Sequence, residues 1–188
     1  MIRLFTGDSL PTFDVNWQST YIISRFLAYG GNAPFAPFYM DENDTVLSVL
    51  SGDAVLYATH LNIEEWACFL AMHPDITTVT ASWDIATSLA DTLQKTVQPK
   101  KVMRLQNALS VTPTLVTEQT PRQIYPLLKA VFGDTMPAFD DWYVDVSHRL
   151  RHNNCTVAGV SLENEPVSTA MTVAQSADAI VIGAVATS

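Results

Sequence analysis

Apolar side chains in the first hundred residues follow two different periods. Between residues 17 and 29 they recur every three to four positions, which predicts an amphipathic helix that ends at Gly30-Gly31. The apolar runs at 45–51 and 53–59 instead flank Gly52 and predict a β-hairpin, because glycine readily takes the positive φ of a tight turn. The other elements expected in this part are strands at 2–5, 77–81 and 102–105, helices at 63–73 and 83–96, and a proline-broken loop at 32–39.

The rest of the chain predicts a strand, two helices and then three strands. Thr120-Pro121 begins a helix that runs toward Phe132, and Pro126 is expected to kink or restart it. The other elements expected are a strand at 114–117, a helix at 140–152, and an antiparallel meander of strands at 155–162, 167–174 and 179–187. We therefore expect an α/β (α+β) fold with a mixed, mainly antiparallel sheet and flanking helices. Two domains, 1–108 and 109–188, are expected around a short linker at 107–113.

Charge and cysteine content narrow the classes of partner. The 188 residues include 19 acidic and 10 basic side chains, and the net charge of -9 argues against binding to nucleic acid or to anionic membranes. No apolar run reaches the roughly 18–20 residues of a membrane span, and the N-terminus lacks the pattern of a secretion signal. Two cysteines, Cys68 and Cys155, predict buried thiols in a reducing compartment. The expected location is the cytoplasm.

Three blocks of sequence resemble one protein family. They are residues 139–152 (FDDWYVDVSHRLRH), 167–174 (VSTAMTVA) and 182–187 (IGAVAT). Together with the order strand, helix, helix and three antiparallel strands, they are similar to the opening half of the GNAT superfamily of acyl-CoA-dependent N-acetyltransferases. Residues 1–108 resemble the accessory N-terminal domain of a bacterial two-domain subgroup, and 109–188 the N-terminal half of the GNAT domain.

The resemblance implies a function and a site. Acetyl-CoA would be the co-substrate, and the backbone groups of Val185, Ala186 and Thr187 would hydrogen-bond its pantetheine arm like an added strand. Trp142, Tyr143 and Asp145 would border the site of the acceptor amine, which is a small molecule or a peptide that the sequence does not identify. The resemblance assigns no catalytic residue to this chain.

One family feature has no counterpart in the sequence. After the strand that matches 179–187, the family has a glycine- and arginine-rich turn that opens a helix and holds the CoA pyrophosphate. Here Ser188 follows, and none of the seven glycines forms such a spacing. The fold is therefore expected to be incomplete at its C-terminus, and the chain to be impaired or inactive as an enzyme.

The alternative is a non-catalytic, GNAT-derived interaction module or oligomerising fragment. The strand at 179–187 is apolar and, in the family, meets the missing half. An exposed apolar edge invites pairing. We therefore expect this strand to pair either with the sheet of residues 1–108 or with a second copy in a homodimer.

Other candidate sites have structural explanations beside the functional ones. His148 and His152 have the i, i+4 spacing of metal ligands, but they also suit a cationic helix C-terminus, and no metal is expected. Asp140, Asp141 and Asp145 form either a general-base cluster or the favourable first turn of a helix. The loop at 34–38, with Phe35 and Phe38, is a candidate contact surface.

Overall fold

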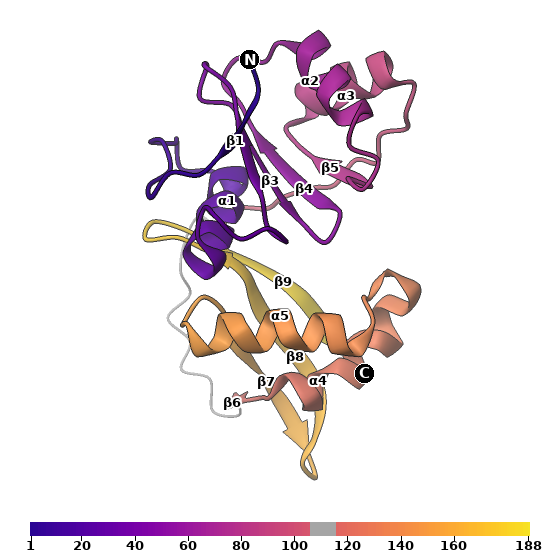
Figure 1. Ribbon diagram of the computed structural model, residues 1–188. Coiled ribbons are helices and arrows are strands. Elements are labelled where there is room, and N and C mark those ends of the chain that lie inside the picture. The colour runs from indigo at the N-terminus through magenta and orange to yellow at the C-terminus, as the bar shows by residue number, and fades with distance from the viewer. Residues whose placement is uncertain (106–115) are drawn as a thin grey trace. The chain divides into compact units, whose positions relative to one another are not determined.

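The computed structural model describes residues 1–105 and 116–188, which form two compact units, Met1–Val102 and Met103–Ser188 (Figure 1). The expected linker at 107–113 and the expected boundary between residues 108 and 109 lie outside the described residues. Both units are mixed α+β with mostly antiparallel sheets, as the sequence predicted.

A five-stranded sheet forms the centre of the first unit, in the order β1-β2-β3-β4-β5. The neighbouring strands are antiparallel except for the parallel pair β4 and β5. The strands are β1 (Arg3–Phe5), β2 (Phe38–Met40), β3 (Val46–Leu50), β4 (Asp53–Tyr57) and β5 (Thr78–Thr80).

Helices cover both faces of this sheet, which explains its near-continuous apolar strands. Helix α1 (Trp17–Tyr29) packs on one face through Ile22, while α2 (Ile63–Ala71) and α3 (Trp83–Leu93) pack on the other. Successive side chains of a strand point to opposite faces. Val46 therefore joins the α1 cluster and Leu47 the cluster around α2, and both are buried.

Most elements of the first unit lie where the sequence predicted them, because turn residues set their bounds. Ser51 and Gly52 both have positive φ (50° and 79°), which closes the β3–β4 hairpin in two residues. Three expectations for residues 1–105 are wrong. Strand β2 begins inside the expected loop, residues 102–105 form no strand, and α3 ends at Leu93 because Gln94 is left-handed (φ 53°).

Two helices cover one face of the sheet in the second unit. The sheet has the order β6-β7-β8-β9 and is antiparallel throughout. A single buried cluster joins α4, α5 and the three long strands, and Figure 1 shows α5 lying across the sheet. The elements are β6 (Thr117–Glu118), α4 (Pro121–Phe132), the 3-10 helix η1 (Gly133–Thr135), α5 (Phe139–Arg151), β7 (Val157–Leu162), β8 (Glu165–Gln175) and β9 (Ile180–Thr187).

The start of α4 agrees with the sequence, but its proline does not break it. Thr120 and Gln123 form a reciprocal capping box, and Pro121 is at the first helical position. Helix α4 continues through Pro126 without a restart. The hydrogen bond that proline cannot donate would reach the carbonyl of Arg122, and both residues are exposed, so water can satisfy that carbonyl.

In the described part of the chain, no helix combines the length and the apolar character that crossing a membrane requires.

Candidate functional site

The open edge of β9 is the first candidate site. Among the described residues β8 is the only strand that pairs with β9. The Ser188 N–H donates to the Val167 carbonyl at 2.9 Å. Because backbone groups of alternate residues point to opposite sides of an antiparallel strand, Ala186 also faces β8. The N–H and C=O groups of Val185 and Thr187 therefore point to the open edge.

Of the three residues expected to bind the pantetheine arm, two are thus suitably directed. Val185 and Thr187 are exposed, whereas Ala186 is 3% exposed and its side chain belongs to the core under α4 and α5. Ala186 holds the strand in place, and its backbone is not directed to the edge. The expected pairing of this strand, either with the sheet of residues 1–108 or with a second copy, stays a prediction.

A β-bulge interrupts β9 beside those groups. Thr169 is opposite Ala186 and Met171 is opposite Gly183, so two residues of β9, Ala184 and Val185, face one residue of β8. Ala184 has φ 49°, a left-handed conformation that is uncommon for alanine. The bulge changes the direction of the backbone immediately before the outward-facing Val185.

A second bulge lies on β8 and is held from α5. The register shifts around Val173, and Arg149 donates to the Val173 carbonyl at 3.0 Å. Arg149 also donates to Asp145 at 2.7 and 3.1 Å, one helical turn away. Asp145, expected to border the acceptor site or to act as a base, is therefore the partner of a nearly buried arginine that supports the sheet.

The other two expected acceptor-site residues belong to an aromatic cluster at the start of α5. Trp142 lies 5.3 Å from Tyr125 between ring centroids and packs against the core. Tyr143 stacks on Phe139 at 5.3 Å, and the Arg122 guanidinium carbon lies 5.0 Å from the centroid of its ring. Trp142 therefore packs against the core of the second unit, while Tyr143 is half-buried and lies next to a cation.

Electrostatics distinguish Tyr143 from an ordinary surface tyrosine. Hydrogen bonding from Arg122, followed by that from Ser147, lowers the pKa of the Tyr143 phenol, and the charge of Arg151 acts in the same direction. The same contact with Tyr143 raises the pKa of Arg122. Tyr143, Ser147 and Arg151 were not predicted as a charged site, although their four-residue spacing is visible in the sequence.

Buried polar atoms mark a further place that sequence reasoning missed. The Gln119 amide nitrogen donates to the Val160 and Ser168 carbonyls at 3.2 Å each, while its Oε1 has no partner in the described structure. A Cβ on Gly159 would lie 2.4 Å from that oxygen and 2.0 Å from the Ser168 carbonyl oxygen. Gln119 therefore bridges β7 and β8 through space that only a glycine leaves.

The histidine pair and the acidic residues form no metal site in the described structure. His148 and His152 have ring centroids 4.2 Å apart, and His152 Nδ1 lies 2.8 Å from the His148 carbonyl oxygen. Asp140 and Asp141 occupy the first turn of α5, where their charge favours the helix. No group of three or more potential ligands occurs among the residues described.

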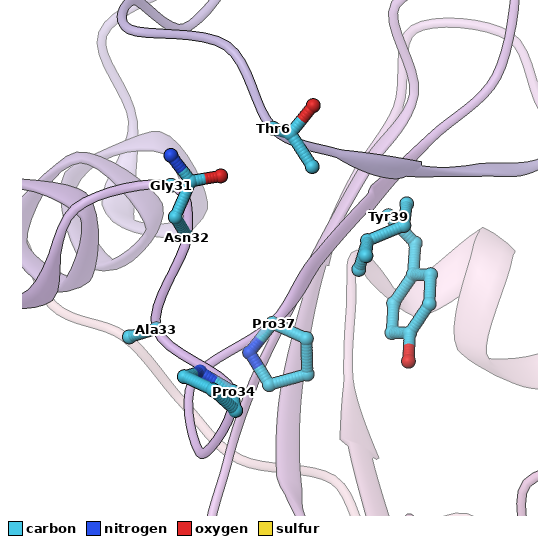
Figure 2. Close-up of a pocket in the computed structure, with 8 residues that line it drawn as sticks. Thr6, Gly31, Asn32, Ala33, Pro34, Pro37 and Tyr39 are labelled. Atoms are coloured by element: carbon cyan, nitrogen blue, oxygen red, sulfur yellow. The ribbon is translucent and has the colours of Figure 1, made fainter.

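The first unit contains a small pocket beside the proline-containing loop (Figure 2). Its volume is about 350 Å³. Phe35 in this loop is exposed, as expected for a contact residue, but Phe38 is fully buried and begins β2, so the expectation for Phe38 is wrong. The pocket is lined by Leu4, Thr6, Gly31, Asn32, Ala33, Pro34, Pro37 and Tyr39, none of which is charged.

Neither cysteine forms a disulfide, but only one is buried. Cys155 is 4% exposed, and burial raises the pKa of its thiol. Cys68 is exposed, so its expected burial is wrong. Trp66 and Leu70 face the core from α2, and Cys68 lies between them in sequence on the outer side of the helix.

No protein-family model, no curated protein and no solved structure matches this chain.

Proposed function

We propose that the second unit is an acyltransferase scaffold of the GNAT type, whose β9 edge receives the pantetheine arm of acetyl-CoA. The single observation that carries this proposal is the open edge of β9, with two outward-facing residues immediately after a bulge. The strand has no charged side chain, which suits the uncharged pantetheine amides. The element order from β6 to β9 also supports it, because the resemblance implies this order.

In this proposal backbone groups of β9, rather than side chains, make most of the contacts with acetyl-CoA. The N–H and C=O groups of Val185 and Thr187 bind the amides of the arm as an added strand. A backbone N–H at the bulge would lie beside the thioester and polarise its carbonyl. An acceptor amine that has lost a proton to solvent would then attack the carbonyl carbon, the C–S bond would break, and CoA would leave as a thiolate that takes up a proton. Asp145 is not assigned as the base, because Arg149 already engages its carboxylate.

The affinity expected from these contacts is low. Two residues provide up to four hydrogen bonds, and each contributes about 1 kcal/mol net. A total of about 4 kcal/mol corresponds to a Kd of about 1 mM at the tightest, because the translational and rotational freedom lost on association weakens binding further. Catalysis by this chain is therefore expected to be slow at ordinary acetyl-CoA concentrations.

The test is a titration of the isotope-labelled chain with acetyl-CoA, followed by NMR. Amide shifts are expected along β9, and pantetheine should reproduce them whereas adenosine 3′,5′-bisphosphate should not. Val185→Pro removes the outward N–H and should abolish these shifts, while Val185→Ala keeps it and should bind like the parent chain. Equal binding by the proline variant, or shifts elsewhere than β9, would contradict the proposal.

A second candidate function uses the same edge. Ile180, Ile182 and Val185 are 62%, 65% and 58% exposed on a strand that has no charge to discourage pairing. A homodimer through two β9 strands would cover them. Sedimentation velocity separates the two proposals: a concentration-dependent dimer that Val185→Pro dissolves and acetyl-CoA leaves intact favours the interaction module over the acyltransferase.

The proposed location is the cytoplasm, where acetyl-CoA is present and thiols stay reduced. The free thiols of Cys68 and Cys155 fit a reducing compartment.

A further inference from the structure

One stripe of α5 brings positive charge together around a single phenol. Phe139, Tyr143, Ser147 and Arg151 recur every four residues, so they share one face of the helix. Phe139 stacks on one side of the Tyr143 ring, and Arg122 reaches over from α4 to lie 5.0 Å from its centroid. The stripe therefore combines two helices and two guanidinium groups at the surface.

Neither of these arginines forms a salt bridge among the described residues. Four basic side chains occur between residues 116 and 188, and the other two are paired, Lys129 with Asp134 at 3.9 Å and Arg149 with Asp145 at 2.7 Å. Asp140, three residues before Tyr143, makes no ion pair with Arg122 in the described structure. Two cations thus remain without a carboxylate in a chain whose net charge is -9.

Both guanidinium groups contact the protein in the unliganded chain. The Arg122 guanidinium makes a cation–π contact with the Tyr143 ring, with its central carbon 5.0 Å from the ring centroid. Arg151 donates from Nε to the Ser147 carbonyl at 3.2 Å, and no described hydrogen bond uses its terminal nitrogens. Side chains that are already ordered lose less entropy on binding.

The pKa of the Tyr143 phenol shows the effect of these positive charges on its oxygen. Hydrogen bonding from Arg122 and from Ser147 lowers the pKa of this phenol, with a smaller effect of the Arg151 charge. An oxygen whose negative form is stabilised in this way lies where another anion is also stabilised. A neutral phenol at the same place offers an O–H donor.

This chemistry fits one kind of ligand group. Guanidinium forks bind carboxylate and phosphate oxygens through paired N–H donors, and a phenol adds a third donor. We propose that Arg122, Tyr143 and Arg151 bind the anionic group, a carboxylate or a phosphate, of a small ligand. The site does not depend on the acyltransferase proposal. If both hold, the acceptor amine carries an acidic group as well.

The test is an NMR titration of the labelled full chain with sodium acetate and, separately, with inorganic phosphate. Ionic strength is held at 0.15 M with chloride, where a Debye length of about 8 Å screens the net charge but not direct contacts. Saturable shifts are expected at Tyr143, Ser147 and the two arginine side chains. Tighter binding of phosphate indicates a phosphate ligand, and equal or tighter binding of acetate indicates a carboxylate.

Variants distinguish binding at these three residues from non-specific electrostatic attraction of anions to the chain. Arg122→Gln and Arg151→Gln should each weaken binding at least tenfold, and Tyr143→Phe several-fold. Lys129→Gln is the matched control, because it removes one exposed positive charge from α4 outside the stripe. Circular dichroism checks that each variant is folded. Shifts that do not saturate for either anion, or an equal loss in the Lys129 variant, would overturn the proposal.

Discussion

At the scale of single residues, the two thiols have opposite surroundings although the sequence suggested the same one for both. Cys155 is in the core of the second unit, and burial raises the pKa of its thiol, which disfavours the reactive thiolate. Cys68 is exposed on α2. We expect one fast-reacting thiol in the native chain and two after unfolding, measured with a chromogenic disulfide reagent. Cys68→Ser should remove the fast phase, and two fast thiols in the native chain would contradict this arrangement.

Tyr143 should ionise below the usual tyrosine range. Arg122 stabilises the tyrosinate, so the pKa of Tyr143 in the folded chain lies below the ordinary tyrosine value of 10.0. A depressed pKa means that the folded state gains stability as the pH rises through the folded pKa toward the unfolded one, and that this gain is absent at lower pH. Tyrosinate absorbance against pH should show one early phase that Tyr143→Phe removes. Arg122→Gln should move this phase to higher pH, and an unchanged phase would contradict the contact.

The buried Asp41 shows why single polar residues are hard to place from sequence. It is 2% exposed and accepts from the Trp66 indole nitrogen at 2.8 Å and from the Asn43 and Thr45 amides at 2.8 and 3.0 Å. Asp41 and Trp66 are 25 positions apart, and no local pattern relates them. Only the packing of α2 on the sheet brings the two together.

At the scale of elements, the antiparallel meander of β7, β8 and β9 depends on a contact that helix α5 makes with β8. Arg149 links the Val173 carbonyl in the β8 bulge to Asp145. Arg149→Met should lower the free energy of unfolding by about 2–3 kcal/mol, because a nearly buried charged donor is lost together with its hydrogen bonds to Asp145 and to the Val173 carbonyl. Urea denaturation followed by circular dichroism measures this.

Arg151→Met is the matched control for that experiment. Arg151 is exposed and donates only to the Ser147 carbonyl of its own helix among the contacts described. Its loss should change the unfolding free energy by less than about 0.5 kcal/mol. Equal losses in the two variants would mean that the bulge does not need Arg149.

The elements themselves were largely predictable because their signals are local. The cap at Thr120 and the period of three to four before Gly30 each depend on a few neighbouring residues. Strand β2 was missed since its three residues follow Pro37 in a loop-like stretch, and it is a strand because β1 and β3 pair with it on both sides. Pro126 did not end α4 because that position faces water.

At the scale of the whole molecule, the first unit should fold by itself. Two buried clusters, one on each face of its sheet, lie entirely within Met1–Val102. A fragment with these residues should unfold cooperatively in urea, with a stability of roughly 5–10 kcal/mol for about a hundred residues. Trp66→Ala should cost about 3–5 kcal/mol, because it leaves a cavity and removes a partner of Asp41. Gradual unfolding of the parent fragment would show that the unit is not autonomous.

The sequence alone determined the α+β class, most of the element boundaries and the antiparallel meander, because periodicity, capping and turn residues act over a few positions. It also placed Val185, Ala186 and Thr187 on one strand. Only the tertiary structure decided which of them face the open edge of β9. It also decided that Asp145 forms a salt bridge with Arg149 and that Arg122 contacts the ring of Tyr143. These facts depend on register and on the packing of one helix against another, and both are set by contacts between residues far apart in the chain.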